Sequence, residues 1–112
     1  MAFYRVYTGQ DGQSHLEKQD MASRPELTQE QVATTITFRE APPGRFSDWH
    51  PAPRRQYLIQ LSGEVEVVMG DGTSVRYVPG DVRLVADTTG QGHTTRVVSD
   101  QPSVTAVIPL AD

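Results

Sequence analysis

The chain has 112 residues, the usual size of a single domain. It has no cysteine, which excludes disulfide frameworks, thiolate metal sites and cysteine nucleophiles. Its 14 acidic and 10 basic residues give a formal net charge of −4, the wrong sign for a surface that binds nucleic acid through its phosphates. No apolar run approaches the roughly 20 residues of a membrane-spanning helix, and the N-terminus lacks a signal-peptide pattern. We therefore expect a cytoplasmic protein whose partners include neither a nucleic acid nor a membrane.

The N-terminal part of the chain differs from the rest. Residues 3–7 have the pattern of a strand, whereas residues 8–33 are polar and rich in turn formers. They indicate an extended arm with one short helical turn after Pro25, because proline is favoured at the first position of a helix. We expect a single domain over residues 1–112, with an N-terminal strand and arm at 1–33 and a barrel at 34–110.

From residue 34 onward, short runs rich in Val, Ile, Thr, Tyr and Phe are separated by clusters of Gly, Pro, Asp and Ser. The separating clusters favour tight turns, as in Ser62-Gly63 and Pro79-Gly80. Many short strands without a helical period predict an all-β sandwich or barrel. The predicted strands span residues 34–40, 46–51, 56–61, 64–69, 74–78, 82–86, 93–98 and 103–109.

Two neighbouring predicted strands carry polar side chains on faces that also carry apolar ones. Strand alternation puts Asp48 and His50 on one face, and it puts Gln56, Leu58 and Gln60 on one face of the next strand. A small barrel with such an inner wall is typical of a pocket for a small molecule. We expect these residues to bind the ligand, with His50 as a candidate catalytic group.

The spacing of five residues between Gly44 and Gly63 resembles the first motif of the cupin superfamily. Gly44 is followed after five residues by His50, and Gly63 closes the run. Between them, Ala52 occupies the position of the family's second histidine and Gln56 that of its glutamate. In the family, these histidines and the glutamate hold a divalent metal inside a small β-barrel, so two of three ligand types differ here.

A second, looser resemblance runs from Val78-Pro79-Gly80-Asp81 to His93. Gly90 stands three residues before His93, as in the family's second motif, although Thr88 replaces the usual proline. The resemblance implies that His93 is the remaining ligand. It covers residues 34–109 and implies a cupin, an all-β double-stranded β-helix or jelly-roll barrel. It also implies a homodimer, for which the strand at residues 3–7 offers an edge.

The resemblance implies a divalent metal held by a reduced set of His50, Gln56 and His93. Imidazole and amide ligands are compatible with Mn, Fe, Ni, Cu or Zn. The main hypothesis is an enzyme of lyase, isomerase or oxygenase type that acts on a small molecule, with His50 and His93 as catalytic residues. Without a metal, either histidine can serve as a general base. The alternative is a metal-free cupin that binds a ligand as a sensor, because Ala52 and Gln56 replace two usual ligands.

Five further residues have plainer interpretations. Trp49 and Tyr57 lie out of phase with the inward set, so we expect them on the barrel exterior or at a dimer interface. Arg54 and Arg55 occupy a predicted turn and are either solvated or placed to steer an anion into the pocket. His15 lies in the arm without a spacing partner, so we expect a surface residue rather than a ligand.

Overall fold

This computed structural model describes residues 1–111. These residues form ten strands in two sheets and two short 3-10 helices, which are joined by loops. The elements are β1 (Phe3–Thr8), β2 (Ser14–Gln19), η1 (Met21–Ser23), η2 (Pro25–Thr28), β3 (Thr37–Ala41), β4 (Phe46–His50), β5 (Gln56–Ser62), β6 (Val65–Met69), β7 (Ser74–Tyr77), β8 (Val82–Ala86), β9 (His93–Val97) and β10 (Ser103–Pro109).

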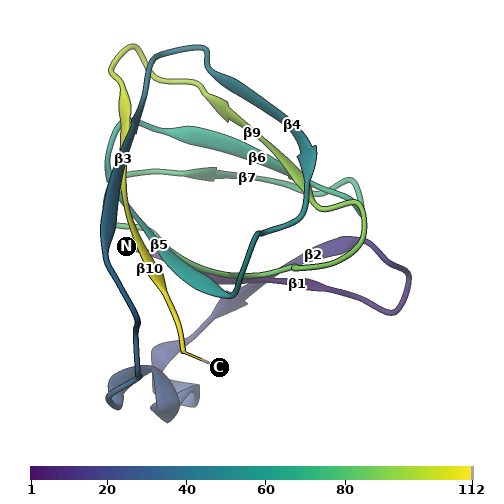
Figure 1. Ribbon diagram of the computed structural model, residues 1–112, viewed down its shortest axis with the longest axis vertical. Helices are drawn as coiled ribbons and strands as arrows, with labels where there is room; N and C mark the ends of the chain where they lie inside the picture. Colours follow the sequence, from purple (N-terminus) through teal and green to yellow (C-terminus); the bar gives the residue numbers. More distant parts are fainter. Residues whose placement is uncertain (112) are drawn as a thin grey trace.

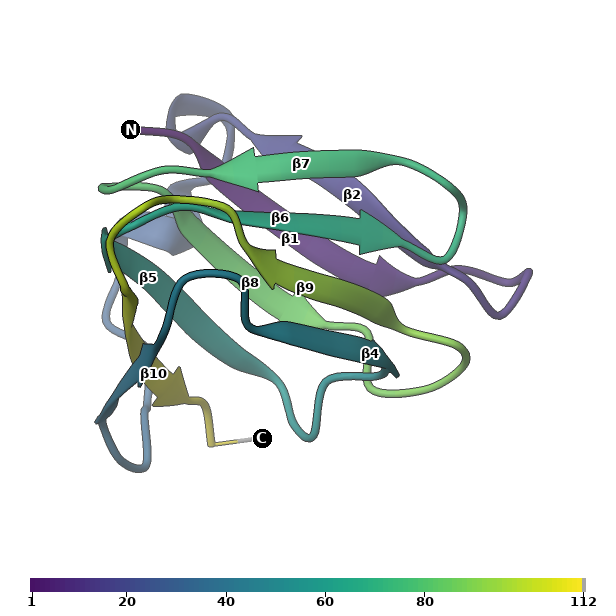
Figure 2. The same cartoon turned by 90° about the horizontal axis from the view of Figure 1, so that it is seen from above.

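The six-stranded sheet has the order β2-β1-β8-β5-β10-β3, and the four-stranded sheet has the order β4-β9-β6-β7. The two sheets face one another in Figure 1, and Figure 2 shows β4 and β7 at opposite edges of the smaller sheet. All eight strands predicted after residue 33 are present, with ends shifted by at most three residues. The predicted all-β jelly-roll architecture is confirmed.

The N-terminal segment is more regular than the sequence indicated. Residues 14–19 were expected in an extended arm, but they form strand β2, which pairs with β1 from Phe3↔Gln19 to Thr8↔Ser14. The sequence SHLEKQ does not reveal this strand because Leu16 is its only apolar residue, so it shows no apolar–polar alternation. On its other side β1 pairs with β8, in parallel. Strand β1 is therefore interior to the sheet, and the expectation that residues 3–7 offer a free edge to a partner is wrong.

The hydrophobic core lies between the two sheets. In β6 the alternation is clean, with Val65, Val67 and Met69 buried and Glu66 exposed. The core cluster draws on both sheets and consists of Val6, Ala52, Val65, Val67, Met69, Tyr77, Val85 and Val97. Because inward side chains of facing sheets interdigitate, this cluster holds the sheets at a fixed separation.

Strand β3 lies at one edge of the larger sheet and β4 at one edge of the smaller sheet, and these two strands are the least covered part of the fold. Every residue of 31–50 except Ala41 is exposed. Over residues 1–111, no helix has the length and apolar character needed to cross a membrane. The cytoplasmic location stays a prediction.

Candidate functional site

A hollow of about 190 Å³ opens between the sheets on the side of the edge strands. This volume is in the range that admits a small organic molecule. Its lining residues are Arg39, Ser47, His50, Ala52, Pro53, Gln56, Leu58, Val85, His93 and Thr95. Of the residues proposed from sequence, His50, Gln56, Leu58 and His93 line the hollow together. Asp48 and Gln60 do not, and the structure gives each a different environment.

Strands β4 and β9 bring the two histidines together. His50 and His93 are register partners across these antiparallel strands, and their ring centroids are 5.0 Å apart. The backbone before β9 approaches the end of β4 closely because the residue before His93 is a glycine, Gly92. At Gly92, φ is +81° and a Cβ atom would lie 2.0 Å from the carbonyl oxygen of His50, so only glycine fits. His93 is 8% exposed, whereas His50 lies at the exposed mouth.

Asp87 orients His93 and was missed by the sequence analysis. Its Oδ2 lies 2.5 Å from Nδ1 of His93 and accepts a hydrogen bond of 2.6 Å from the Ser14 hydroxyl. A carboxylate only accepts, so Nδ1 of His93 carries a proton and Nε2 is left free to bind a metal or a proton. Asp87 is fully buried, and its Oδ1 has no partner. The sequence contains one signal that could have identified Asp87: it is an acidic residue that directly follows the apolar end of β8.

His50 is oriented in a different way. Its Nδ1 lies 2.7 Å from the backbone carbonyl of Asp48, which can only accept, so Nε2 of His50 is free as well. The carboxylate of Asp48 accepts a hydrogen bond from the amide of Trp49, and Asp48 is not among the residues that line the hollow. The expected alternation fails here because the β4–β9 register shifts between Ser47 and His50. Asp48 therefore lies outside the lining of the hollow, and a ligand contact of its side chain stays a prediction.

The two glutamines of β5 have opposite surroundings. Gln56 is 3% exposed and lines the hollow. The amide of Gln60 is satisfied, since it donates to Ser62 O and Ser103 Oγ and accepts from Arg83. An amide at the wall of the hollow can contact a ligand, whereas the amide of Gln60 is bonded within the core. Gln60 therefore lies outside the lining of the hollow, and its ligand role stays a prediction.

Arg83 completes the buried network around Gln60. Its guanidinium lies 4.3 Å from the centroid of the Tyr77 ring, and burial lowers its pKa from the ordinary value. Burial also raises the pKa of Tyr77 above its usual range. These groups stabilise the interior away from the hollow.

The walls of the hollow carry positive charge and no carboxylate. Arg39 is the one Arg or Lys among the lining residues, and no Asp or Glu is present there. Sequence reasoning considered Arg54 and Arg55 for this position. Instead Arg54 is exposed, and Arg55 lines a different hollow, with Arg5 and Tyr57 on the outer face of the larger sheet. Trp49 is exposed and Tyr57 lies on the exterior, as predicted.

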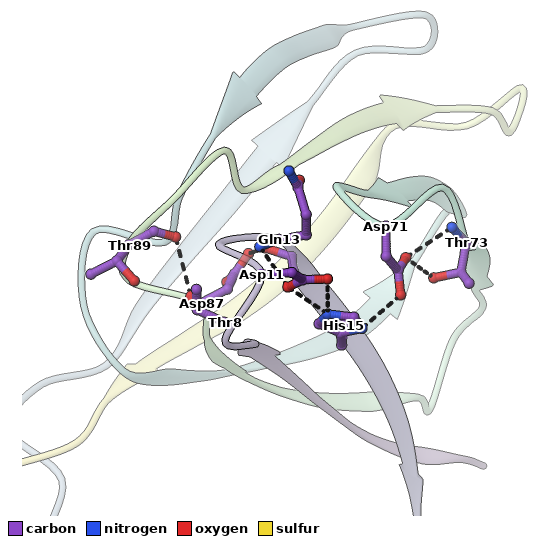
Figure 3. Close-up of polar contacts among 9 residues, drawn as sticks. Thr8, Asp11, Gln13, His15, Asp71, Thr73, Asp87 and Thr89 are labelled. Carbon is purple, nitrogen blue, oxygen red and sulfur yellow. Dashed lines mark hydrogen bonds and ion pairs between the residues drawn. The ribbon is translucent and has the colours of Figure 1, made fainter.

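His15 lies in a separate cluster at the ends of the β1–β2 and β6–β7 turns (Figure 3). Its Nε2 is 3.0 Å from Asp11 Oδ1, and its Nδ1 is 2.9 Å from Asp71 Oδ2. The hydrogen bond to Asp11 is the main cause that raises the pKa of His15. The same bond lowers the pKa of Asp11. Within residues 1–111, no group of three or more His, Cys, Asp or Glu side chains is arranged as a metal site, this cluster included.

Comparison with solved structures identifies the fold. The cupin domain of Cnp3 from Schizosaccharomyces pombe matches with a TM-score of 0.59 at 13% identity, over 88% of this chain and 73% of its own. A Cupin 2 conserved barrel domain protein from Salinispora arenicola matches with a TM-score of 0.55 at 20% identity, over 68% and 61%. The DMSP lyase DddQ from Ruegeria pomeroyi matches with a TM-score of 0.56 at 22% identity, over 69% and 38%.

No family model matches the chain, and no curated protein is similar to it in sequence. The fold is that of a small cupin domain, a double-stranded β-helix, and the resemblance noted in the sequence is confirmed at this level. Identities below 25% speak for the fold alone, because one fold hosts many unrelated activities. The function is therefore argued from the hollow.

Proposed function

We propose that the hollow binds a small organic molecule and that His50, Gln56 and His93 hold a divalent metal ion beside it. The protein is then a metal-dependent enzyme of lyase, isomerase or oxygenase type. One observation carries the proposal: two adjacent imidazoles have their Nδ1 atoms engaged by acceptors, so that both Nε2 atoms are free at one site.

The donor set fits a divalent ion. Imidazole nitrogen suits Mn, Fe, Ni, Cu and Zn, and the amide of Gln56, which lines the hollow, can add an oxygen. The contact between Asp87 and His93 is the carboxylate–histidine arrangement that fixes a ligating ring and raises its basicity. When bound, the ion would supply Lewis-acid activation of the substrate. Leu58 and Val85 make part of the wall apolar, which limits the access of water.

A second candidate function is a metal-free cupin that binds a small ligand without turning it over. It is favoured by the donor set, which contains no carboxylate, and by Ala52, which lines the hollow where the family has a histidine. In this case Nε2 of His50 and of His93 would contact the ligand directly. The two candidates differ in whether the metal is present and whether the ligand is consumed.

Metal content tests the proposal directly. Untagged protein is incubated with Mn, Fe, Ni, Cu and Zn in turn, and the bound metal is measured by elemental analysis. The test variant is His50→Ala/His93→Ala, and the matched control is His15→Ala, since the chain has three histidines and His15 lies in another cluster. We expect near-stoichiometric metal in the wild type and the control, and none in the double variant. Equal metal in all three, or none in any, would overturn the proposal.

A further inference from the structure

We propose that the small molecule bound in the hollow is an organic anion, and that its carboxylate pairs with Arg39. This inference rests on the proposed function, because it assigns the substrate class of the same site. It differs from the metal proposal in the residues that carry it, which lie on the edge strands β3 and β4 and on β9.

Arg39 stands where two hollows meet. The hollow of about 190 Å³ that contains the histidines shares Arg39, Ser47 and Thr95 with a neighbouring hollow of about 280 Å³. The second hollow extends along β3 and β10 on one side and β4 and β9 on the other. The shared residues make the two hollows one continuous groove along the open edge of the fold.

The charge of Arg39 is not neutralised by the protein. Among residues 1–111, Arg39 has no ion-pair partner, whereas Arg5 and Arg24 pair with Glu17, and Arg76 pairs with Glu64. No carboxylate lines the histidine-containing hollow, although the chain as a whole has a net charge of −4. In the neighbouring hollow Glu40 and Arg45 carry opposite charges, so the positive charge of Arg39 remains uncompensated at the histidine-containing end. A positive site attracts anions.

The surrounding groups are hydrogen-bond donors of the kind an anion needs. Ser47 and Thr95 are register partners on β4 and β9, and both hydroxyls lie on the wall that includes Arg39. The guanidinium presents parallel N–H donors that match the two oxygens of a carboxylate. A carboxylate held by Arg39 would leave the rest of a small molecule between the sheets, where Gln56, His50 and His93 line the same hollow.

The chemistry of the partner is tested with matched probes. Acetate, lactate and malonate are titrated into the full-length protein beside acetamide, lactamide and malonamide, and inorganic phosphate is titrated separately. Binding is followed by calorimetry and by amide chemical shifts of β4 and β9. The variants are Arg39→Gln and Arg39→Lys. The control is Arg54→Gln, because Arg54 is an exposed arginine of the turn before β5 that lines neither hollow.

We expect at least one carboxylate to bind better than its amide, with shifts centred on Ser47, His93 and Thr95. Arg39→Gln should weaken this binding about two- to fivefold, the range for an ion pair made by an exposed arginine, and Arg39→Lys should weaken it less. Arg54→Gln should bind as the wild type does. The inference would be overturned if acids and amides bound equally well. It would also be overturned if Arg39→Gln and Arg54→Gln had equal effects, or if phosphate were the only probe that bound.

The outcome is separable from that of the metal proposal. Arg39 is not among the metal donors, so Arg39→Gln should take up as much metal as the wild type. Normal metal uptake without any preference for carboxylates overturns the anion inference alone. If the protein takes up no metal from any of the five ions but binds carboxylates selectively through Arg39, the anion inference is supported and the metal proposal is overturned.

Discussion

Among the single residues of the site, Asp87 has the largest influence on what His93 can do. It does not line the hollow, so it acts through the imidazole as a positioning residue. A carboxylate holds the ring with a proton on Nδ1, and an amide in its place can stabilise the other tautomer. Ser14 helps to fix the carboxylate, because its hydroxyl donates to the same oxygen.

We therefore predict that Asp87→Asn changes the tautomer of His93 and leaves that of His50 unchanged. In the wild type, ¹⁵N–¹H correlation spectra of the metal-free protein should show the Nδ1–H form for the neutral rings of both His50 and His93. The variant should bind divalent metal about 10- to 100-fold more weakly. His50 is the internal control, since its Nδ1 partner is the backbone carbonyl of Asp48. An Nε2–H form of His93 in the wild type would contradict the prediction.

Gln56→Glu tests the donor set by adding the charge that it lacks. If Gln56 is a ligand, a carboxylate should raise the affinity for a divalent ion by about tenfold or more, because ligand charge is a main determinant of affinity. Without metal, the new carboxylate is buried at a position that is 3% exposed, so the melting temperature should fall and then recover when metal is added. Calorimetry and thermal melts measure both effects. Unchanged affinity, with no recovery of stability, would favour the metal-free candidate function.

At the scale of elements, the crossing of the loop before β9 over the end of β4 determines the site. Gly92→Ala would combine a left-handed φ with a Cβ atom 2.0 Å from the His50 carbonyl oxygen. Gly44→Ala is the matched control, since its φ of +82° is similar and nothing lies within 4 Å. We expect Gly44→Ala to lower the free energy of unfolding by about 1–2 kcal/mol. Gly92→Ala should lower the free energy of unfolding by more than Gly44→Ala does, as measured by urea unfolding. It should also abolish metal binding, as measured by elemental analysis. Equal effects of the two variants would contradict this prediction.

The His15 cluster links two other elements, the β1–β2 turn and the β6–β7 turn, in a pH-dependent way. Burial alone would raise the pKa of Asp71, but hydrogen bonds from Thr73 and His15 outweigh it and hold that pKa below its ordinary value of 3.8. The pKa of His15 is raised above 6.5. The ring of Tyr7 also faces this group, stacked on the imidazole at 5.6 Å, and Arg5 lies on the same tyrosine.

The sign of the effect follows from linkage. The contribution of His15 to stability is complete below pH 6.5 and is lost as the pH rises through its raised pKa. The contributions of Asp11 and Asp71 are present above pH 3.8 and are lost as the pH falls through their lowered pKa values. Urea unfolding from pH 3 to 9 should thus show wild type more stable than His15→Gln between these limits, with the difference shrinking toward both ends. A difference in stability between wild type and His15→Gln that stays constant with pH would contradict this role of His15 between the two turns.

The sequence predicted the strands well because alternation and turn residues are local signals. Val65-Glu66-Val67 in β6 and the Pro79-Gly80 turn need no long-range information. Strand β2 escaped detection because its sequence SHLEKQ has a single apolar residue, Leu16, and therefore no apolar–polar alternation. Asp48 was misplaced by a register shift, and Arg39 was missed because only the packing of β3 across from β4 brings it to the histidines. Pairings between distant strands, rather than propensities, determine the site.

At the scale of the whole molecule, the open edge formed by β3 and β4 calls for an explanation. Both strands lack a neighbour on one side, and an unpaired edge is a template for another chain. The exposed large apolar residues there are Val32, Ile36, Phe38, Phe46 and Trp49. All five lie within residues 32–49, and a concentration of exposed apolar side chains in one segment favours an interaction site there. The homodimer expected from sequence therefore stays a prediction, but its interface moves from residues 3–7 to this edge.

We predict that a second copy of the chain covers this edge and partly closes the hollow, because Arg39 belongs to the same strand as Phe38. Sedimentation should show a dimer that dissociates on dilution, and the emission of the only tryptophan, Trp49, should shift to the red as it does. Phe38→Lys should give a monomer, since charge on an edge strand opposes pairing. Val78→Lys, which replaces an exposed apolar residue of the β7–β8 turn, should remain dimeric. A wild type that is monomeric at every concentration, or a Phe38→Lys variant that still dimerises, would contradict this interface.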